Sequence, residues 1–269
     1  MTRRTNIPHL RDFLWTLQKR QQASYQRQPL QTNPPRQRGD GFTRMIVVMS
    51  FETAPPPSAL PTDPHASDEP RPDYYDDLAG SLRHAWQMLG RATKDRRSAF
   101  HAPVVANSAA DGPQARVMIL RSVDAAARQL TFYTDTRSAK TLALALDARV
   151  AVTFYDAARK LQVRASGLGV LHTGDALAEA RWQASSPSSL RCYAGQTPGD
   201  ISAVPSSGLP AELEGRLPQW AELSSAQAHF AVLSITLQRM EWLYLHTGGQ
   251  RRALYQWTDS DCVMNWLNP

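Results

Sequence analysis

The chain has 269 residues, of which 42% are hydrophobic and 20% are charged. This length accommodates one large domain or two small ones, and the apolar content excludes a wholly disordered chain, a collagen-like repeat and a disulfide-rich miniprotein. A net charge of +6 and a pI of about 9.6 suggest a polyanionic partner, provided that the charge is spread over the folded part of the chain.

The positive charge is confined to one end of the chain. Residues 1–48 hold nine basic and two acidic residues, a net +7, whereas residues 49–269 hold 21 basic and 22 acidic residues, a net −1. Residues 1–72 also contain 11 of the 19 prolines, which disfavour helices and central strands. We therefore expect residues 1–72 to be a disordered basic, proline-rich leader and residues 73–269 to form the folded domain. Met45 or Met49 would each make a sensible start for the folded protein, so we hypothesise that part or all of residues 1–48 is absent from the natural product.

Cysteine, histidine and hydropathy patterns narrow the class of protein further. Cys192 and Cys262 make neither a zinc motif nor a disulfide framework, which favours a reducing, cytoplasmic compartment. The seven histidines lack metal-ligand spacing, so no metal site is expected. No apolar run approaches the ~18 residues of a membrane span. The arginine-rich leader loosely resembles an organellar transit peptide but is poor in serine.

In chain order, the domain is predicted to begin with one helix and to continue mainly with strands. Asp73 is placed to cap a helix in which apolar residues recur at helical spacing from Leu78 to Leu89. Segments rich in β-branched and aromatic residues predict strands over 102–107, 115–123, 130–133, 150–155, 161–170, 230–237, 240–245 and 252–257. Helical patterns interrupt them at 138–146 and 175–184, and residues 203–218 are predicted to form a loop. Sequential strands with short connections indicate an antiparallel barrel with helices packed outside it, a mainly β (α+β) fold.

Two short motifs do not support the chemistry associated with them. Gly167 and Gly169 begin a GxG, but His172 stands where a dinucleotide fingerprint has its third glycine, so we interpret this segment as a bulge or turn. The serine-rich run 185–189 contains no GxSxG elbow, so an acyl-transfer nucleophile is not expected there.

Residues 116–140 are the most informative stretch. Arg116 and Arg121 bound an apolar strand, and Ser138 is placed to cap a helix that carries Lys140 in its first turn. The free N–H groups and dipole of that helix start, together with the cations, could hold a phosphate through charge-assisted hydrogen bonds. The alternative is an ordinary charged strand end and helix start. Arg116 and Arg121 have opposite parity, so they serve one ligand only if the ligand is long or a bulge intervenes.

The same residues open a series of motifs in which the chain resembles the pyridoxamine 5′-phosphate oxidase family. The series comprises 116–121, 132–134 with Ser138 and Lys140, 161–164 with Gly167, 182–187, 196–197, 240–242, 252–255 and 266–269. Each motif is weak by itself, but their order spans nearly all of residues 73–269. The resemblance implies a six-stranded antiparallel Greek-key split β-barrel with flanking helices, forming a homodimer with FMN at the subunit interface.

The resemblance also implies roles for individual residues. The FMN phosphate would be held by Arg116, Ser138 and Lys140. The flavin would lie beside the strand residues Val117, Met118, Ile119, Leu120, Arg121, Tyr133 and Thr134, with Gln162 facing its ring system. Gln196, Thr197 and Arg252 would reach in from the partner subunit. Because the flavin carries the chemistry in such proteins, no catalytic side chain is expected.

Several positions depart from the family pattern, mostly on the substrate side. Arg121 stands where the family has a lysine, Trp182 where it has a tyrosine, Ser186 where it has a phosphate-binding arginine, and Gly248-Gly249-Gln250 where it has Arg-x-His. At the cofactor, Ala139 replaces an arginine and Leu243 a tryptophan. FMN binding is therefore better supported than pyridoxamine phosphate oxidation. Arg121, Trp182 and Gln250 are the substrate candidates, although Trp182 also suits packing of its helix onto the barrel.

The leading interpretation is an FMN-dependent oxidoreductase that acts on a small molecule. The alternatives within the same fold are a non-enzymatic flavin-binding or carrier protein and a genuine pyridoxamine or pyridoxine 5′-phosphate oxidase. A further alternative is a cofactor-free module whose leader binds nucleic acid through arginines interleaved with Trp15 and Tyr25. Since the basicity is confined to that leader, neither nucleic acid nor membrane is expected as a partner.

Overall fold

The computed structural model describes residues 70–258 and 261–269, so all but the last three residues of the expected leader lie outside the described part. The helices are α2 (Leu78–Ala92), α3 (Ala139–Leu146), α4 (Ala176–Gln183), α5 (Pro187–Leu190) and the 3₁₀ helices η1 (Arg191–Ala194), η2 (Ala211–Leu213) and η3 (Trp220–His229). The strands are β1 (Val104–Ala109), β2 (Gly112–Val117), β3 (Leu120–Asp124), β4 (Gln129–Asp135), β5 (Arg149–Asp156), β6 (Leu161–His172), β7 (Phe230–Tyr244), β8 (Arg251–Trp257) and β9 (Cys262–Leu267). Among the described helices, none is long and apolar enough to cross a membrane.

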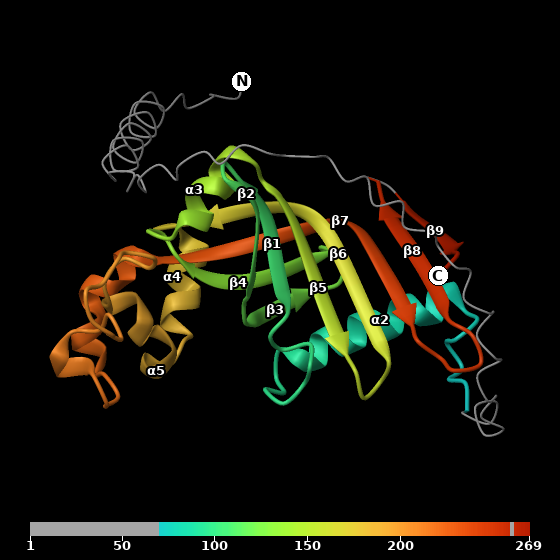
Figure 1. Ribbon diagram of the computed structural model, residues 1–269, viewed down its shortest axis with the longest axis horizontal. Helices are drawn as coiled ribbons and strands as arrows, with labels where there is room; N and C mark the ends of the chain where they lie inside the picture. The colour runs from blue at the N-terminus through green and yellow to red at the C-terminus, as the bar shows by residue number, and fades with distance from the viewer. Residues whose placement is uncertain (1–69, 259–260) are drawn as a thin grey trace, which may run out of the picture. The chain divides into compact units, whose positions relative to one another are not determined.

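The strands form one antiparallel sheet that curls into the expected split barrel (Figure 1). Along the sheet the order is β2-β1-β5-β6-β7-β4-β3, with β8 and β9 added beside β7. The two edge strands β2 and β3 are separated in the chain only by Met118 and Ile119. Counted as one bent strand they close a barrel of six strands, which agrees with the expected number. The predicted strand over 115–123 is therefore split at this corner, where the segment changes its pairing partner from β1 to β4.

Apolar side chains from alternating positions of these strands fill the barrel. Phe132, Phe154 and Trp242 are among its fully buried residues. Helix α2 contacts β3, β7, β8 and β9, and Figure 1 shows it extending along the barrel from β3 towards β8. A second apolar cluster lies around Trp182 and Phe230, where α4, α5, η1 and η3 pack near the start of β7.

Helix α2 begins one turn later than predicted. Its N-cap is Asp77 rather than Asp73, and the Asp77 carboxylate accepts a hydrogen bond from the Ala79 amide at 2.9 Å. Tyr74 and Tyr75 form a turn before the helix and pack edge-on against Tyr244 of β7. Docking of these two aromatic rings therefore decides where the helix starts, and helical spacing alone does not reveal it.

Strand β7 is a single strand of 15 residues where two separate strands, 230–237 and 240–245, were predicted. Its pairing with β6 shifts by one residue between Ser166 and Gly167, which leaves Gln238 as the extra residue of a β-bulge. A Cβ on Gly167 would lie 2.0 Å from the Thr236 carbonyl oxygen, so only glycine fits there. The interpretation of this segment as a bulge is confirmed, with Gly167 on the strand opposite the extra residue. Strand β9 was not predicted, because its largely exposed residues show no alternation of polarity.

Candidate functional site

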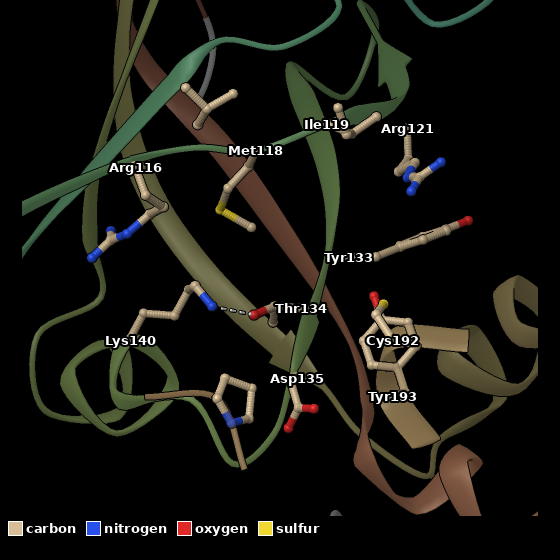
Figure 2. Close-up of a pocket in the computed structure, with 12 residues that line it drawn as sticks. Arg116, Met118, Ile119, Arg121, Tyr133, Thr134, Asp135, Lys140, Cys192 and Tyr193 are labelled. Atoms are coloured by element: carbon tan, nitrogen blue, oxygen red, sulfur yellow. Dashed lines mark hydrogen bonds between the residues drawn. The ribbon is translucent and has the colours of Figure 1, made fainter. Parts of the chain in front are cut away.

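A pocket of about 330 Å³ opens at the corner between β2 and β3, beside β4 and the start of α3 (Figure 2). Its lining comprises Arg116, Val117, Met118, Ile119, Arg121, Tyr133, Thr134, Asp135, Lys140, Cys192, Tyr193 and Pro198. Eight of these residues were proposed from the sequence, namely Arg116, Val117, Met118, Ile119, Arg121, Tyr133, Thr134 and Lys140. The fold therefore brings together most of the set that one protomer was expected to supply.

One end of the pocket is cationic and rich in hydroxyl groups. The Lys140 ammonium donates to Thr134 Oγ1 and to Ser138 Oγ, each at 2.9 Å. Ser138 occupies the predicted N-cap position of α3, but its hydroxyl donates to the Asp135 carbonyl at 2.8 Å and makes no cap to the helix. Ser138 thus positions Lys140 at the start of α3.

Arg116 reaches the same end from β2. Its Nη1 donates to the side-chain oxygen of Asn107, a buried residue, and to the Val105 carbonyl at 3.4 Å. Burial lowers the pKa of Arg116, and burial together with the nearby Arg116 charge lowers the pKa of Lys140. Within the described residues both cations are hydrogen-bonded only to neutral groups. Their proximity is unfavourable until an anion lies between them, so the pair fits a phosphate.

Arg121 enters the pocket through a β-bulge. The pairing of β3 with β4 shifts between Leu120 and Ser122, which makes Arg121 the extra residue and breaks the parity of the strand. The bulge therefore lets Arg116 and Arg121 line one pocket despite their opposite parity. The Arg121 guanidinium lies 5.0 Å from the centre of the Tyr133 ring, and its buried Nε has no hydrogen-bond partner among the described residues.

The Arg121 end of the pocket is aromatic. Tyr133 and Thr134 are consecutive on β4 and point to opposite faces of the strand, so Thr134 meets Lys140 while Tyr133 meets Arg121 (Figure 2). Cys192 and Tyr193 line this end from η1. Burial raises the pKa of Tyr193 far above its ordinary value, so its hydroxyl stays neutral at physiological pH.

Four lining residues were missed by the sequence reasoning, namely Asp135, Cys192, Tyr193 and Pro198. Asp135 is ion-paired with Arg137 at 2.6 Å, and Arg137 also donates to the Gly195 carbonyl at 2.9 Å. This pair fastens the loop that carries the other three residues to the end of β4. The only local sign of this contact in the sequence is Asp135 two residues before Arg137 at a strand end. It does not reveal the loop, because the loop comes from a distant part of the sequence.

The remaining proposed cofactor residues lie elsewhere in the protomer. Leu120 is fully buried in the barrel core, next to the pocket wall. Gln162 lies on β6, paired with Tyr155 and Leu243. Gln196 and Thr197 line a neighbouring pocket of about 420 Å³, which shares Cys192 and Pro198 with the first.

The substrate candidates are spread over three places. Arg121 lines the first pocket, whereas Gln250 lines a pocket of about 430 Å³ near the C-terminus. Arg252, a proposed cofactor residue, lies beside Gln250 and forms a 2.6 Å ion pair with Glu241. Trp182 is 3% exposed and packs against Phe230, which is the packing role considered for it.

Comparison with known protein families gives a match over part of the chain. Residues 82–173 match the family described as pyridoxamine 5′-phosphate oxidase, FMN-binding domain. A pyridoxine/pyridoxamine 5′-phosphate oxidase of Kineococcus radiotolerans is 48% identical over 54 residues, which cover 20% of this chain and only 23% of that relative. FMN is thus the cofactor of the matched family, and the residues of the Arg116 pocket suit it.

Two solved structures show the same fold. A pyridoxamine 5′-phosphate oxidase-related, FMN-binding protein of Nostoc punctiforme is 22% identical with a TM-score of 0.57, and covers 75% of this chain and 100% of its own. PhzG of Burkholderia lata, solved with tetrahydrophenazine-1-carboxylic acid, is 20% identical with a TM-score of 0.57, and covers 75% of this chain and 98% of its own.

Proposed function

We propose that this chain, whose residues 82–173 match the pyridoxamine 5′-phosphate oxidase FMN-binding domain family, is an FMN-dependent oxidoreductase acting on a small molecule. The observation that carries the proposal is the pair of partly buried cations, Arg116 and Lys140, at one end of a pocket whose other end is aromatic. A phosphorylated, flat cofactor matches both ends.

The chain's own residues would hold that cofactor in a fixed orientation. Arg116 and Lys140 would bind its phosphate, with Ser138 holding the Lys140 ammonium in place, and the bend at Met118 and Ile119 would place backbone groups beside its ring. Bound FMN supplies the ability to accept or donate a hydride, which no side chain of the protein supplies. Arg137 and Asp135 hold the η1 loop over the pocket, where it excludes water from one side.

Arg121 is the residue proposed to recognise the substrate. Its Nε is buried without a partner in the described part of the chain, and such a donor is costly unless a ligand supplies an acceptor. The guanidinium lies against Tyr133, and Tyr193 lines the same end of the pocket. These groups suit a small molecule that carries an anionic group next to a flat ring.

A second copy of the chain is proposed to complete the site. Gln196, Thr197 and Arg252 do not line the Arg116 pocket of their own protomer. Val117, at the rim of this pocket, is 63% exposed, so a second copy of the chain could cover it. In this homodimer the three polar residues of one protomer would reach the cofactor held by its partner.

The proposal is tested by anaerobic reduction of the FMN-reconstituted protein. NADH, NADPH and pyridoxamine 5′-phosphate are each added, and loss of the oxidised flavin absorption is followed. Reduction by one of them supports an enzyme, and reduction by pyridoxamine 5′-phosphate identifies the oxidase alternative. A protein that takes up FMN but is reduced by none of them supports the carrier alternative. A protein that takes up no FMN contradicts the proposal.

A further inference from the structure

A second cluster of charged residues lies on the sheet, away from the Arg116 pocket. The Glu241 carboxylate on β7 forms ion pairs with Arg239 of the same strand (N···O 2.7 Å) and with Arg252 of β8 (2.6 Å). The guanidinium of Arg164 on β6 lies 3.6 Å from the same carboxylate. The pairing of β6 with β7 places Arg164 directly opposite Glu241. Three guanidinium groups thus converge on one carboxylate from three neighbouring strands.

The Glu241 carboxylate is already saturated. Its side chain is 8% exposed, one oxygen accepts from Nε and Nη2 of Arg239, and the other accepts from Nε and Nη2 of Arg252. Burial acts to raise the pKa of Glu241, but these hydrogen bonds and the nearby Arg164 hold the pKa below its ordinary value. The carboxylate is therefore charged at neutral pH, and the cluster keeps a net charge of about +2.

The guanidinium of Arg164 has N–H donors that are free to bind a ligand. At 3.6 Å from Glu241 its Nη1 is beyond hydrogen-bond range, its side chain is 54% exposed, and it makes no hydrogen bond to another described residue. Beside it lies a hollow of about 220 Å³ lined by Arg164, Arg239 and Glu241 and by the hydroxyl residues Thr153 and Ser166. This hollow shares no lining residue with the Arg116 pocket. Its guanidinium and hydroxyl groups can donate, and its one carboxylate, Glu241, already accepts from two arginines.

We propose that this hollow is a second anion site, which binds a small oxyanion such as a phosphate group. Two arginines in a hollow that also carries hydroxyl groups provide the fork-like donors that suit a tetrahedral oxyanion. The hollow is smaller than the Arg116 pocket, which suits a single anionic group rather than a whole flavin. Of the cluster, Arg252 is assigned to the FMN of a partner protomer under the proposed function, whereas none of the residues that line the hollow is, so phosphate binding at the hollow can be tested separately.

The test is a titration with inorganic phosphate, followed by ³¹P NMR line broadening on the full chain carrying Arg116→Ala. That background weakens phosphate binding at the first pocket, and all the variants are compared within it, so failure of the FMN proposal does not affect the result. Adding Arg164→Ala is expected to weaken phosphate binding about tenfold, because one charged donor is lost. Adding Arg164→Lys, which keeps the charge, is expected to restore part of the affinity.

The matched control is Arg149→Ala in the same background. Arg149 lies on neighbouring β5 but is already ion-paired with Asp147 at 2.6 Å, so its loss is expected to change phosphate affinity less than twofold. The proposal is overturned if phosphate does not saturate, or if Arg164→Ala and Arg149→Ala behave alike. Sedimentation of the same variants adds a third outcome. If Arg164→Ala dissociates a dimer without weakening phosphate binding, the cluster pairs with a carboxylate of a second copy, and the proposal is wrong.

Discussion

At the scale of single residues, the proposed phosphate site depends on cations that lack an anionic partner of their own. Arg116 and Lys140 are hydrogen-bonded to Asn107, Thr134 and Ser138, which are neutral. Asp135, the acid in the pocket lining, is engaged by Arg137. Burial and the charge of Arg116 therefore lower the pKa of Lys140. A bound phosphate would reverse this effect and stabilise the protonated amine.

The lowered pKa of Lys140 predicts how FMN affinity changes with pH. Binding of the phosphate takes up a proton once the free amine has begun to lose it, so FMN affinity should fall as pH rises towards 10, below the ordinary lysine pKa of about 10.4. Lys140→Met should weaken binding at pH 7 and flatten the profile. Fluorescence titration of FMN at pH 7–10 measures both. A profile that is the same in the two proteins would show that Lys140 does not bind the phosphate.

At the scale of elements, two bulges decide where functional groups lie. The bulge at Arg121 brings this side chain into the same pocket as Arg116, and the bulge opposite Gly167 lets β7 continue as one strand. The bulge at Arg121 could be named from the sequence only as one possibility, because it does not change the hydrophobic pattern. Gly167, by contrast, could be assigned to a bulge or turn from the sequence, because its GxG lacks the third glycine of a dinucleotide-binding fingerprint.

The strand β4 and helix α3 were predictable because their signals are local. Ser138 and Lys140 sit two residues apart at a helix start, so any chain that folds this way brings them together. Tyr193 and Cys192 were not predictable, because the η1 loop reaches the pocket through Arg137 and a backbone carbonyl. Every residue type has a backbone carbonyl, so the sequence does not show which carbonyl will accept such a hydrogen bond.

Gly167→Ala is predicted to destabilise the fold by several kcal/mol. The added Cβ would meet the Thr236 carbonyl at 2.0 Å, and backbone in the middle of the sheet has little room to move. The matched control is Gly90→Ala on α2, where nothing lies within 4 Å of the added carbon. That change should be neutral or stabilise the protein by up to about 1 kcal/mol. Urea unfolding of the two variants checks this, and equal midpoints would contradict the bulge.

At the scale of the whole molecule, the cofactor site is proposed to be shared between two chains. Residues of the Arg116 pocket come from one protomer, whereas Arg252 and Gln196 lie outside it. If a second copy supplies them, FMN affinity should fall when the protein is diluted below the dissociation constant of the dimer. Sedimentation and FMN fluorescence over the same dilution series measure the two together. Affinity that stays constant while dimers dissociate would place the whole site in one chain.

The net charge of +6 of the full chain comes from residues 1–48 and does not describe the rest of the molecule. Residues 49–269 are close to neutral, so the proposed anion binding would depend on where a few cations are placed rather than on their number. The domain concentrates positive charge at two hollows, one around Arg116 and one around Arg164. A general attraction to polyanions is not needed to explain either.

Arg116 and Lys140 are proposed to form a phosphate site for FMN, and calorimetric titration with FMN and with riboflavin tests this. The two ligands differ only in the phosphate, so FMN should bind about 100-fold or more tightly to the unaltered protein, given two charge-assisted contacts. Arg116→Ala should reduce this preference at least tenfold, whereas Arg83→Ala, which removes an exposed arginine of α2, should leave it unchanged. Equal affinity for FMN and riboflavin in the unaltered protein would contradict the account.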